Sequence, residues 1–345
     1  MLSYLSTIGQ ATWYSSFLCV MFPIGLFLFW KREDGCIRIW MVIYLLLAFG
    51  TLVTQNSDSA FAALGVIFLL LFWKAFENRR NWERFLQIMM IFSASCLLIG
   101  SFQRFFAYRA VKPGVLSVFM TQGKWNLFLL FAAFLCYLWS IQSKSGWNGK
   151  TAGKIRNGCF LCIAMIFLLL LLCIALNTKE LSTRWMGMEL PFQEFLYFND
   201  SWGNGRGIIW RISIKLFQRC SFLQKVFGVG PDCYGAFAYS HLEIAEELDS
   251  VWGERRVLCA HSEPLNTLLC YGIAGSIAYY SIFFTALYRY IKKSSARPDV
   301  FAVALCLTAY LGHNLFCYQQ VCCTPFLFIL LGIAEGILKS SEVKA

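Results

Sequence analysis

The sequence contains little charge and little histidine. Charged residues make up 14% of its 345 residues, where a soluble globular chain has about 25%, and only 3 positions are His. Apolar residues take their place: they make up 58% of the chain and include 33 Phe. This composition excludes a soluble enzyme, a disordered chain and a secreted disulfide scaffold, and it indicates a polytopic membrane protein.

Two patterns that often bind metal ions are also missing. No two histidines have the His-x-x-x-His spacing, and the acidic residues include no Asp-x-Asp pair. Most of the 15 cysteines lie inside apolar runs, where a thiol behaves as a small buried side chain. Cys220, Cys233 and Cys259 lie in a polar segment and can form one disulfide if that segment is extracytoplasmic. We therefore predict no metal ion and no cofactor.

Long apolar runs are what the sequence does have. A membrane-crossing helix needs roughly 20 mostly apolar residues, and runs such as 166–172, which contains only Ile, Phe and Leu, fit this requirement. We predict an all-α polytopic membrane protein with about nine transmembrane helices. The predicted spans are residues 13–30, 36–54, 59–75, 85–102, 125–142, 159–176, 266–288, 299–317 and 321–338.

Basic residues follow every second predicted span. They are Lys31, Arg32 and Arg38, then Lys74, Arg79, Arg80 and Arg84, then Lys144, Lys150, Lys154 and Arg156, and finally Arg289, Lys292, Lys293 and Arg297. The short loops 55–58 and 318–320 contain none. Because Lys and Arg gather in cytoplasmic loops, this alternation predicts a multi-pass protein with its N-terminus outside and its C-terminus in the cytoplasm.

Two segments do not follow the alternation. The predicted spans divide the chain into an N-terminal six-helix region (1–176), a long extracytoplasmic loop (177–265) and a C-terminal three-helix region with a short tail (266–345). The long loop is the first of the two segments, and a loop of this length can cross the membrane whatever its charge. The short loop 103–124 also falls outside, yet it is basic. Its cations Arg104, Arg109 and Lys112 either bind lipid phosphates at the outer surface or face an anionic ligand there.

The long loop holds 11 of the 19 acidic residues. Residues 207–226 have apolar positions at three-to-four-residue spacing, which predicts an amphipathic helix that can lie flat on the bilayer. A glycine-rich turn (227–231) and a short acidic helix (241–250) follow. The chemistry of the protein is expected in this loop, because its spans contain few charges.

Four short elements in and after the loop resemble a known family. They are Gly205 to Trp210 with an Arg-x-x-x-Trp spacing, the Gly-x-Gly turn in 226–231, the run Ala-His-Ser-Glu-Pro-Leu-Asn at 260–266, and a Gly-x-x-Gly from Gly272 to Gly275 at the start of a span. In this order and spacing they resemble the O-antigen ligase/polymerase superfamily. Its members are similar in having one large external loop followed by three spans.

The resemblance implies a metal-independent glycosyltransferase in the cytoplasmic membrane of a bacterium. Such a protein moves a glycan from an undecaprenyl-diphosphate-linked oligosaccharide to an acceptor hydroxyl on a glycan or lipid, at the outer face. The expected partners are therefore this donor, the acceptor and membrane lipids, and no nucleic acid is expected. A polymerase and a ligase share this chemistry and differ only in the acceptor.

Arg206 and His261 are the predicted catalytic residues. An arginine can grip a diphosphate leaving group with two donors, and a neutral imidazole can accept the proton of an attacking hydroxyl or orient the acceptor. Further substrate contacts are predicted for Arg211, Arg104, Arg109, Lys112, Glu263, His313 and Asn314. Several of these have plainer readings: Arg211 as a lipid contact, His261 as a helix-start residue, and the pair His313–Asn314 as a hydrogen bond between helices.

Two other functions are compatible with a membrane protein of this kind. A flippase or transporter would move the lipid-linked substrate without breaking a bond, but it would carry internal repeats or charges in its spans, which we do not find. A non-catalytic assembly protein is the third possibility. The concentration of polar residues in one external segment favours the transferase.

Overall fold

A computed structural model describes residues 7–108, 114–143, 147–178, 196–253 and 255–342, and every regular element in these ranges is a helix. This confirms the predicted all-helical class. The predicted contacts Arg109 and Lys112 lie outside the described residues. The helices are α1 (Ala11–Lys31), α2 (Gly35–Thr54), α3 (Asp58–Ala75), α4 (Arg79–Phe105), α5 (Val115–Gln122), α6 (Trp125–Gln142), α7 (Gly149–Thr178), α10 (Trp202–Arg219), α11 (Phe222–Phe227), α12 (Tyr234–Tyr239), α13 (Leu242–Trp252), α14 (Glu263–Lys293), α15 (Asp299–Asn314) and α16 (Thr324–Glu342).

A helix occupies each of the nine predicted spans, and seven of these helices are long and apolar enough to cross a membrane. The seven are α1, α2, α3, α4, α6, α7 and α14. The eighth predicted span, α15, has 16 residues and is about 24 Å long, shorter than the roughly 30 Å hydrocarbon core. The short helix α5, in the loop after α4, was not predicted, since eight residues are too few for a clear apolar period.

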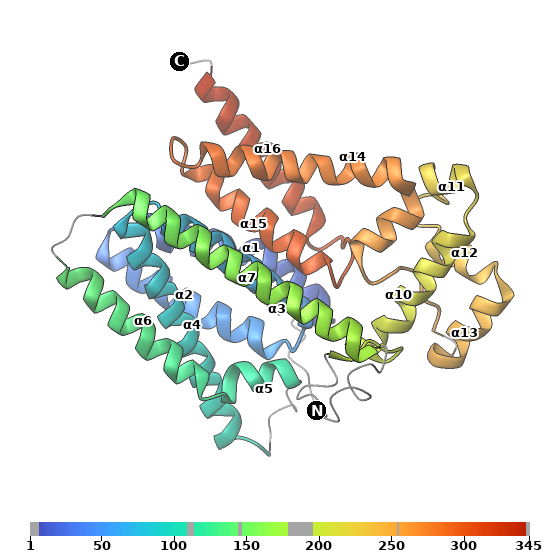
Figure 1. The fold of residues 1–345 in the computed structure, drawn as a ribbon, viewed down its shortest axis with the longest axis horizontal. Coiled ribbons are helices and arrows are strands. Elements are labelled where there is room, and N and C mark those ends of the chain that lie inside the picture. Colours follow the sequence, from blue (N-terminus) through green and yellow to red (C-terminus); the bar gives the residue numbers. More distant parts are fainter. Residues whose placement is uncertain (1–6, 109–113, 144–146, 179–195, 254, 343–345) are drawn as a thin grey trace. The chain divides into compact units, whose positions relative to one another are not determined.

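The described residues pack as two compact units. The first contains residues 1–153, 283–315 and 319–345, and the second contains 154–282 and 316–318. In the first unit α15 packs against both α1 and α3 (Figure 1). The Phe49 ring of α2 meets Phe22 of α1 and Phe92 of α4, with centroids 5.0 and 5.2 Å apart, and forms an aromatic core.

The second unit has its own core, made by one face of α10. Ile208, Ile209, Ile212 and Leu216 are at most 2% exposed and pack with Tyr234, Leu248 and Leu269. The predicted amphipathic helix therefore exists, but the structure corrects its extent and its surroundings. It ends at Arg219, and its apolar stripe is covered by α12, α13 and the start of α14, so this stripe does not lie on a bilayer.

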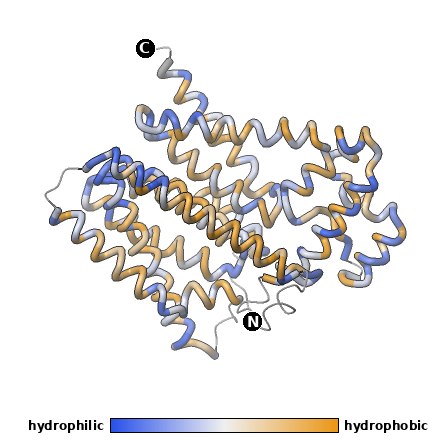
Figure 2. Tube along the Cα trace, viewed as in Figure 1, coloured by the Kyte–Doolittle hydropathy of each residue, from blue (hydrophilic) through white to orange (hydrophobic). Residues whose placement is uncertain are grey.

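Hydropathy differs sharply between the helices (Figure 2). α7 is apolar along most of its length, with a polar start, whereas α13 mixes apolar and acidic residues and buries Ile244 and Leu248. The short helix α11 also leaves apolar side chains uncovered, because Phe222, Leu223 and Phe227 are 79%, 66% and 67% exposed. All fifteen thiols are free, so the structure contains no disulfide among Cys220, Cys233 and Cys259.

Candidate active site in the second unit

The backbone around His261 is held in an unusual conformation. His261 itself has φ +49°, a left-handed value that costs a residue with a Cβ free energy and occurs most often at functional positions. The side chain of Asn266 accepts a hydrogen bond from the amide of Ala260 at 3.2 Å, and the amide of Asn266 donates to the Ser262 carbonyl at 2.9 Å. Asn266, in the first turn of α14, thus fixes the turn that presents His261.

The imidazole of His261 is partly buried and faces two groups. Its ring meets the Tyr318 ring edge-on at 5.3 Å between centroids, and Tyr318 is hydrogen bonded to the Cys259 thiol. Burial, and then the positive charge of Arg206, lower the pKa of His261 below its usual value of about 6.5. The ring is therefore neutral at pH 7, and no hydrogen bond from the described part of the chain occupies either nitrogen.

Arg206 follows a left-handed turn at the start of α10. Gly203, Asn204 and Gly205 have φ values of 60°, 61° and 85°, and the Arg206 guanidinium donates to the Gly203 carbonyl at 3.0 Å. A Cβ at Gly205 would press on the Trp252 ring, and one at Gly207 would collide with the Asn199 carbonyl. The two glycines that flank Arg206 are thus explained by the turn and by packing within the unit.

An aromatic cluster lies at the turn that carries Arg206, and no sequence pattern predicts it. Trp202 and Trp210 lie 5.3 Å apart, and Phe316 meets them at 6.2 and 5.8 Å. The indole N–H groups of Trp210 and Trp252 are buried and have no hydrogen-bond partner within the described residues. The partly exposed rings of Trp202, Trp210 and Phe316 suit a sugar ring, whose C–H faces pack on aromatic faces.

The glycine-rich turn is tied to α14 at a break in that helix. Gly272 has φ +69°, and the amides of Val229 and Gly230 donate to the carbonyls of Leu269 and Cys270, both at 3.0 Å. Gly228 and Gly272 lie so close to the opposite backbone that a Cβ on either would collide with it. Beyond the break the helix continues for about 30 Å to Lys293, which is long enough to cross the hydrocarbon core of a membrane.

Two of the predicted substrate contacts in this unit have partners in the protein. Arg211 forms a two-pronged ion pair with Asp200, at 2.9 and 2.7 Å, and a second ion pair with Glu247 at 2.6 Å. Glu263 is 2% exposed, lies in the first turn of α14 and accepts a hydrogen bond from Thr267 at 3.3 Å. The charge of Arg206 lowers the pKa of His261, and Arg211 and Glu263 make contacts within the fold.

The remaining predicted contacts lie in the first unit. His313 and Asn314 are 1% and 3% exposed. The ring of His313 is hydrogen bonded to Ser59 at 3.0 Å, to Asn314 at 3.2 Å and to Ser15 at 3.5 Å, so it links α15 to α3 and α1. This is the helix-to-helix role that the sequence left open. Arg104 is exposed in the last turn of α4.

Comparison with protein families, with curated proteins and with solved structures finds no match to this chain. The chemistry of the site must therefore be argued from its own groups. The described residues hold no cluster of three metal-binding side chains. Burial raises the pKa of the Cys259 thiol to about 11, so this thiol stays protonated at pH 7 and is a poor nucleophile. The neutral imidazole of His261 is left as a group that can accept a proton at pH 7.

Proposed function

We propose that the chain is a membrane glycosyltransferase that moves a glycan from an undecaprenyl-diphosphate carrier to an acceptor hydroxyl. The observation that carries the proposal is His261, a partly buried imidazole on a left-handed backbone whose pKa is lowered by burial and by the charge of Arg206. Proton acceptance and stabilisation of a leaving diphosphate are the two tasks of such a reaction, and the two residues suit one task each. The motif resemblance of the sequence points the same way.

The proposed step balances as a direct displacement. The acceptor oxygen attacks the anomeric carbon of the donor sugar, and the bond from that carbon to the diphosphate oxygen breaks. The hydroxyl proton passes to the neutral imidazole of His261. The electron pair leaves with undecaprenyl diphosphate, whose developing negative charge the Arg206 guanidinium stabilises. The aromatic cluster of Trp202, Trp210 and Phe316 supplies the surface for the sugar.

The proposal places the site at the outer surface of a bacterial cytoplasmic membrane, where the carrier presents its diphosphate. Two features support a site near the membrane surface. The long apolar part of α14 begins at Gly272, close in sequence to His261, and the exposed Phe222, Leu223 and Phe227 of α11 suit contact with lipid. Phosphatase fusions test the orientation: one near residue 245 is expected to be active, and one near residue 150 inactive.

The deciding assay uses purified protein in detergent with undecaprenyl-diphosphate oligosaccharide and EDTA. We expect free undecaprenyl diphosphate and a glycan joined to the acceptor. A second carrier-linked unit and an unrelated lipid acceptor, offered separately, distinguish a polymerase from a ligase. Movement of the intact donor across a vesicle membrane, without release of undecaprenyl diphosphate, would instead identify the flippase alternative and refute the proposal.

A further inference from the structure

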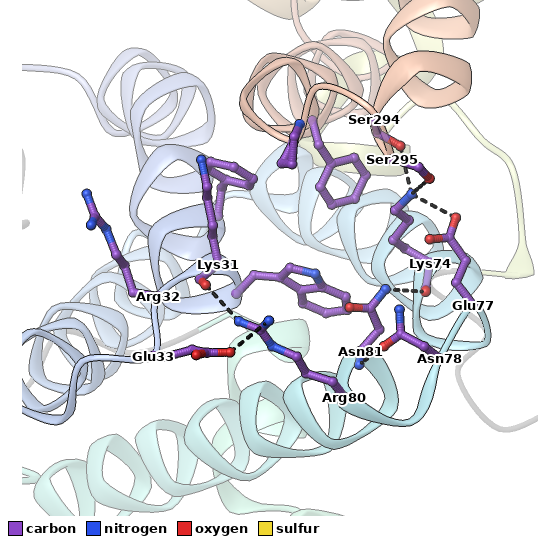
Figure 3. Close-up of a pocket in the computed structure, with 14 residues that line it drawn as sticks. Lys31, Arg32, Glu33, Lys74, Glu77, Asn78, Arg80, Asn81, Ser294 and Ser295 are labelled. Carbon is purple, nitrogen blue, oxygen red and sulfur yellow. Dashed lines mark hydrogen bonds and ion pairs between the residues drawn. The ribbon is translucent and has the colours of Figure 1, made fainter. Parts of the chain in front are cut away.

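The first unit contains a cavity that has no part in the proposed reaction. Its volume is about 790 Å³, within the range of small-molecule sites. It lies where the end of α1, the end of α3, the start of α4 and the segment between α14 and α15 come together (Figure 3). All of its walls belong to the first unit.

The walls of the cavity are basic. Lys31, Arg32, Lys74 and Arg80 line it, and Glu33 and Glu77 are the only carboxylates in the lining. Asp299 adds a third carboxylate beside it, bonded to Lys31 at 2.6 Å. Four cations against three carboxylates leave an excess of one positive charge. The helices α4 and α15 also start here, and their N-terminal dipoles add to the positive potential.

The inner end of the cavity is closed and electrically balanced. Lys74, whose side chain is 8% exposed, donates to Glu77 and to Ser294, both at 2.7 Å, and lies over the Phe301 ring at 5.6 Å. Phe27, Trp30 and Phe301 are less than a tenth exposed and give this part an apolar floor. These contacts balance the charge of Lys74 within the protein. The excess positive charge therefore lies at the open end of the cavity, its mouth.

The mouth holds the cations that a ligand can reach. Arg80 bonds Glu33 at 2.8 Å and the Lys31 carbonyl at 2.9 Å, yet its side chain is 52% exposed, and that of Lys31 is 42% exposed. For Arg32 no side-chain hydrogen bond or ion pair is found within the described part of the chain. The mouth therefore offers one unused guanidinium next to two accessible cations.

We infer that this cavity binds the phosphate of an anionic phosphoester, with Lys31, Arg32 and Arg80 as its ligands. The single excess charge matches a phosphodiester monoanion, and guanidinium groups hold phosphate oxygens well. The apolar floor suits the glycerol and first methylenes of a phospholipid. Basic pockets between the ends of membrane helices bind such headgroups. A soluble phosphate ester offers the same chemistry without the acyl chains.

The test measures lipid binding to the purified full chain by native mass spectrometry and by melting in detergent. Phosphatidylglycerol and phosphatidylcholine are compared on wild type, on a Lys31→Gln/Arg32→Gln variant, and on a Lys150→Gln/Lys154→Gln control. The control removes two exposed lysines of α7 that do not line the cavity. The single variant Arg32→Gln serves if the double variant melts early, because Arg32 makes no described side-chain contact.

We expect wild type and control to prefer phosphatidylglycerol and to melt higher with it. The cavity variant should lose roughly 30-fold in affinity for this lipid, and the single variant roughly fivefold. If glycerol 3-phosphate in lipid-free detergent protects wild type but not the cavity variant, the site stands and its ligand is a soluble phosphate ester. An unchanged lipid preference in the cavity variant, an equal loss in the control, or a wild type that shows neither a lipid preference nor protection by glycerol 3-phosphate would overturn the inference.

Discussion

The surroundings of His261 and His313 differ although both histidines lie at the end of a helix beside polar residues. The ring of His313 is 1% exposed and is hydrogen bonded to Ser59, Asn314 and Ser15. The ring of His261 is partly exposed, takes no hydrogen bond from the described residues, and sits on a left-handed backbone beside a cation. The first histidine holds helices together, and the second has nitrogens available for proton transfer.

Two arginines of α10 also differ in their described contacts. Arg211 forms ion pairs with Asp200 and Glu247. Arg206 donates a hydrogen bond to the Gly203 carbonyl, and its charge lowers the pKa of His261. Substitutions in these two pairs, one of histidines and one of arginines, should therefore differ in their effects on activity and on stability.

The largest effect is expected from Arg206→Gln. This change removes the cation that faces the leaving diphosphate, and loss of one such preorganised donor lowers turnover by about 10²–10³-fold. Glycan release by purified protein measures it, with membrane expression as the control for folding. Arg206→Lys keeps the charge and loses the two-pronged grip, so it should recover only part of the rate. Wild-type turnover in Arg206→Gln would contradict the proposal that Arg206 stabilises the leaving diphosphate.

His313→Ala should act on stability and leave the chemistry intact. It removes the buried hydrogen bonds of the ring to Ser59 and Asn314, each of which contributes about 0.5–1.5 kcal/mol. Thermal melting in detergent should therefore shift down, while turnover per folded molecule stays at the wild-type value. A variant that melts like wild type but transfers no glycan would place His313 in the reaction after all.

Arg211→Gln should have a smaller effect than either change. Its ion pairs join α10 to α13 and to Asp200, but the side chains involved are 28–57% exposed, and pairs of this kind contribute about 0.2–1 kcal/mol. Melting should fall slightly, and donor affinity should stay unchanged. A marked loss of affinity for the lipid diphosphate would show that the arginine leaves its carboxylates when the donor binds.

The pH dependence of turnover should report the lowered pKa of His261. Because the folded protein holds this imidazole neutral below pH 6.5 while the unfolded chain protonates there, the acid limb of kcat/KM should lie below pH 6.5, and stability should decline as the pH falls through this range. In Arg206→Gln the residual activity should show the acid limb moved to higher pH, because the charge that helps to lower the pKa of His261 is removed. An acid limb above 6.5 in wild type would contradict the burial of the ring.

The sequence predicted the membrane helices well, because apolar length is a local property. The predicted span 125–142 coincides with α6, whereas 159–176 covers only the apolar part of α7, which starts ten residues earlier in a basic stretch. The amphipathic stripe of α10 was also visible in the sequence. Its covering was not, because a stripe looks the same whether a bilayer or α12 and α13 lie on it.

The site was predictable only in part. The motifs predicted His261 and Arg206 as site residues. The effect of the Arg206 charge on the pKa of His261, and the left-handed turns at 203–205 and 261, depend on how distant segments pack. Phe316 and Tyr318, which complete the surroundings, follow α15 and show no pattern that links them to the loop. The sequence could not separate Arg206 from Arg211, since the carboxylates that engage Arg211 lie on other elements.

The most direct test compares glycan transfer by wild type, His261→Ala and His313→Ala at equal amounts of folded protein, with saturating lipid-linked donor and EDTA. We expect wild type and His313→Ala to turn over at the same rate, and His261→Ala to be slower by at least 10²-fold while it still binds the donor. A rate for His261→Ala within a few-fold of wild type, or an equal loss in both variants, would contradict the account.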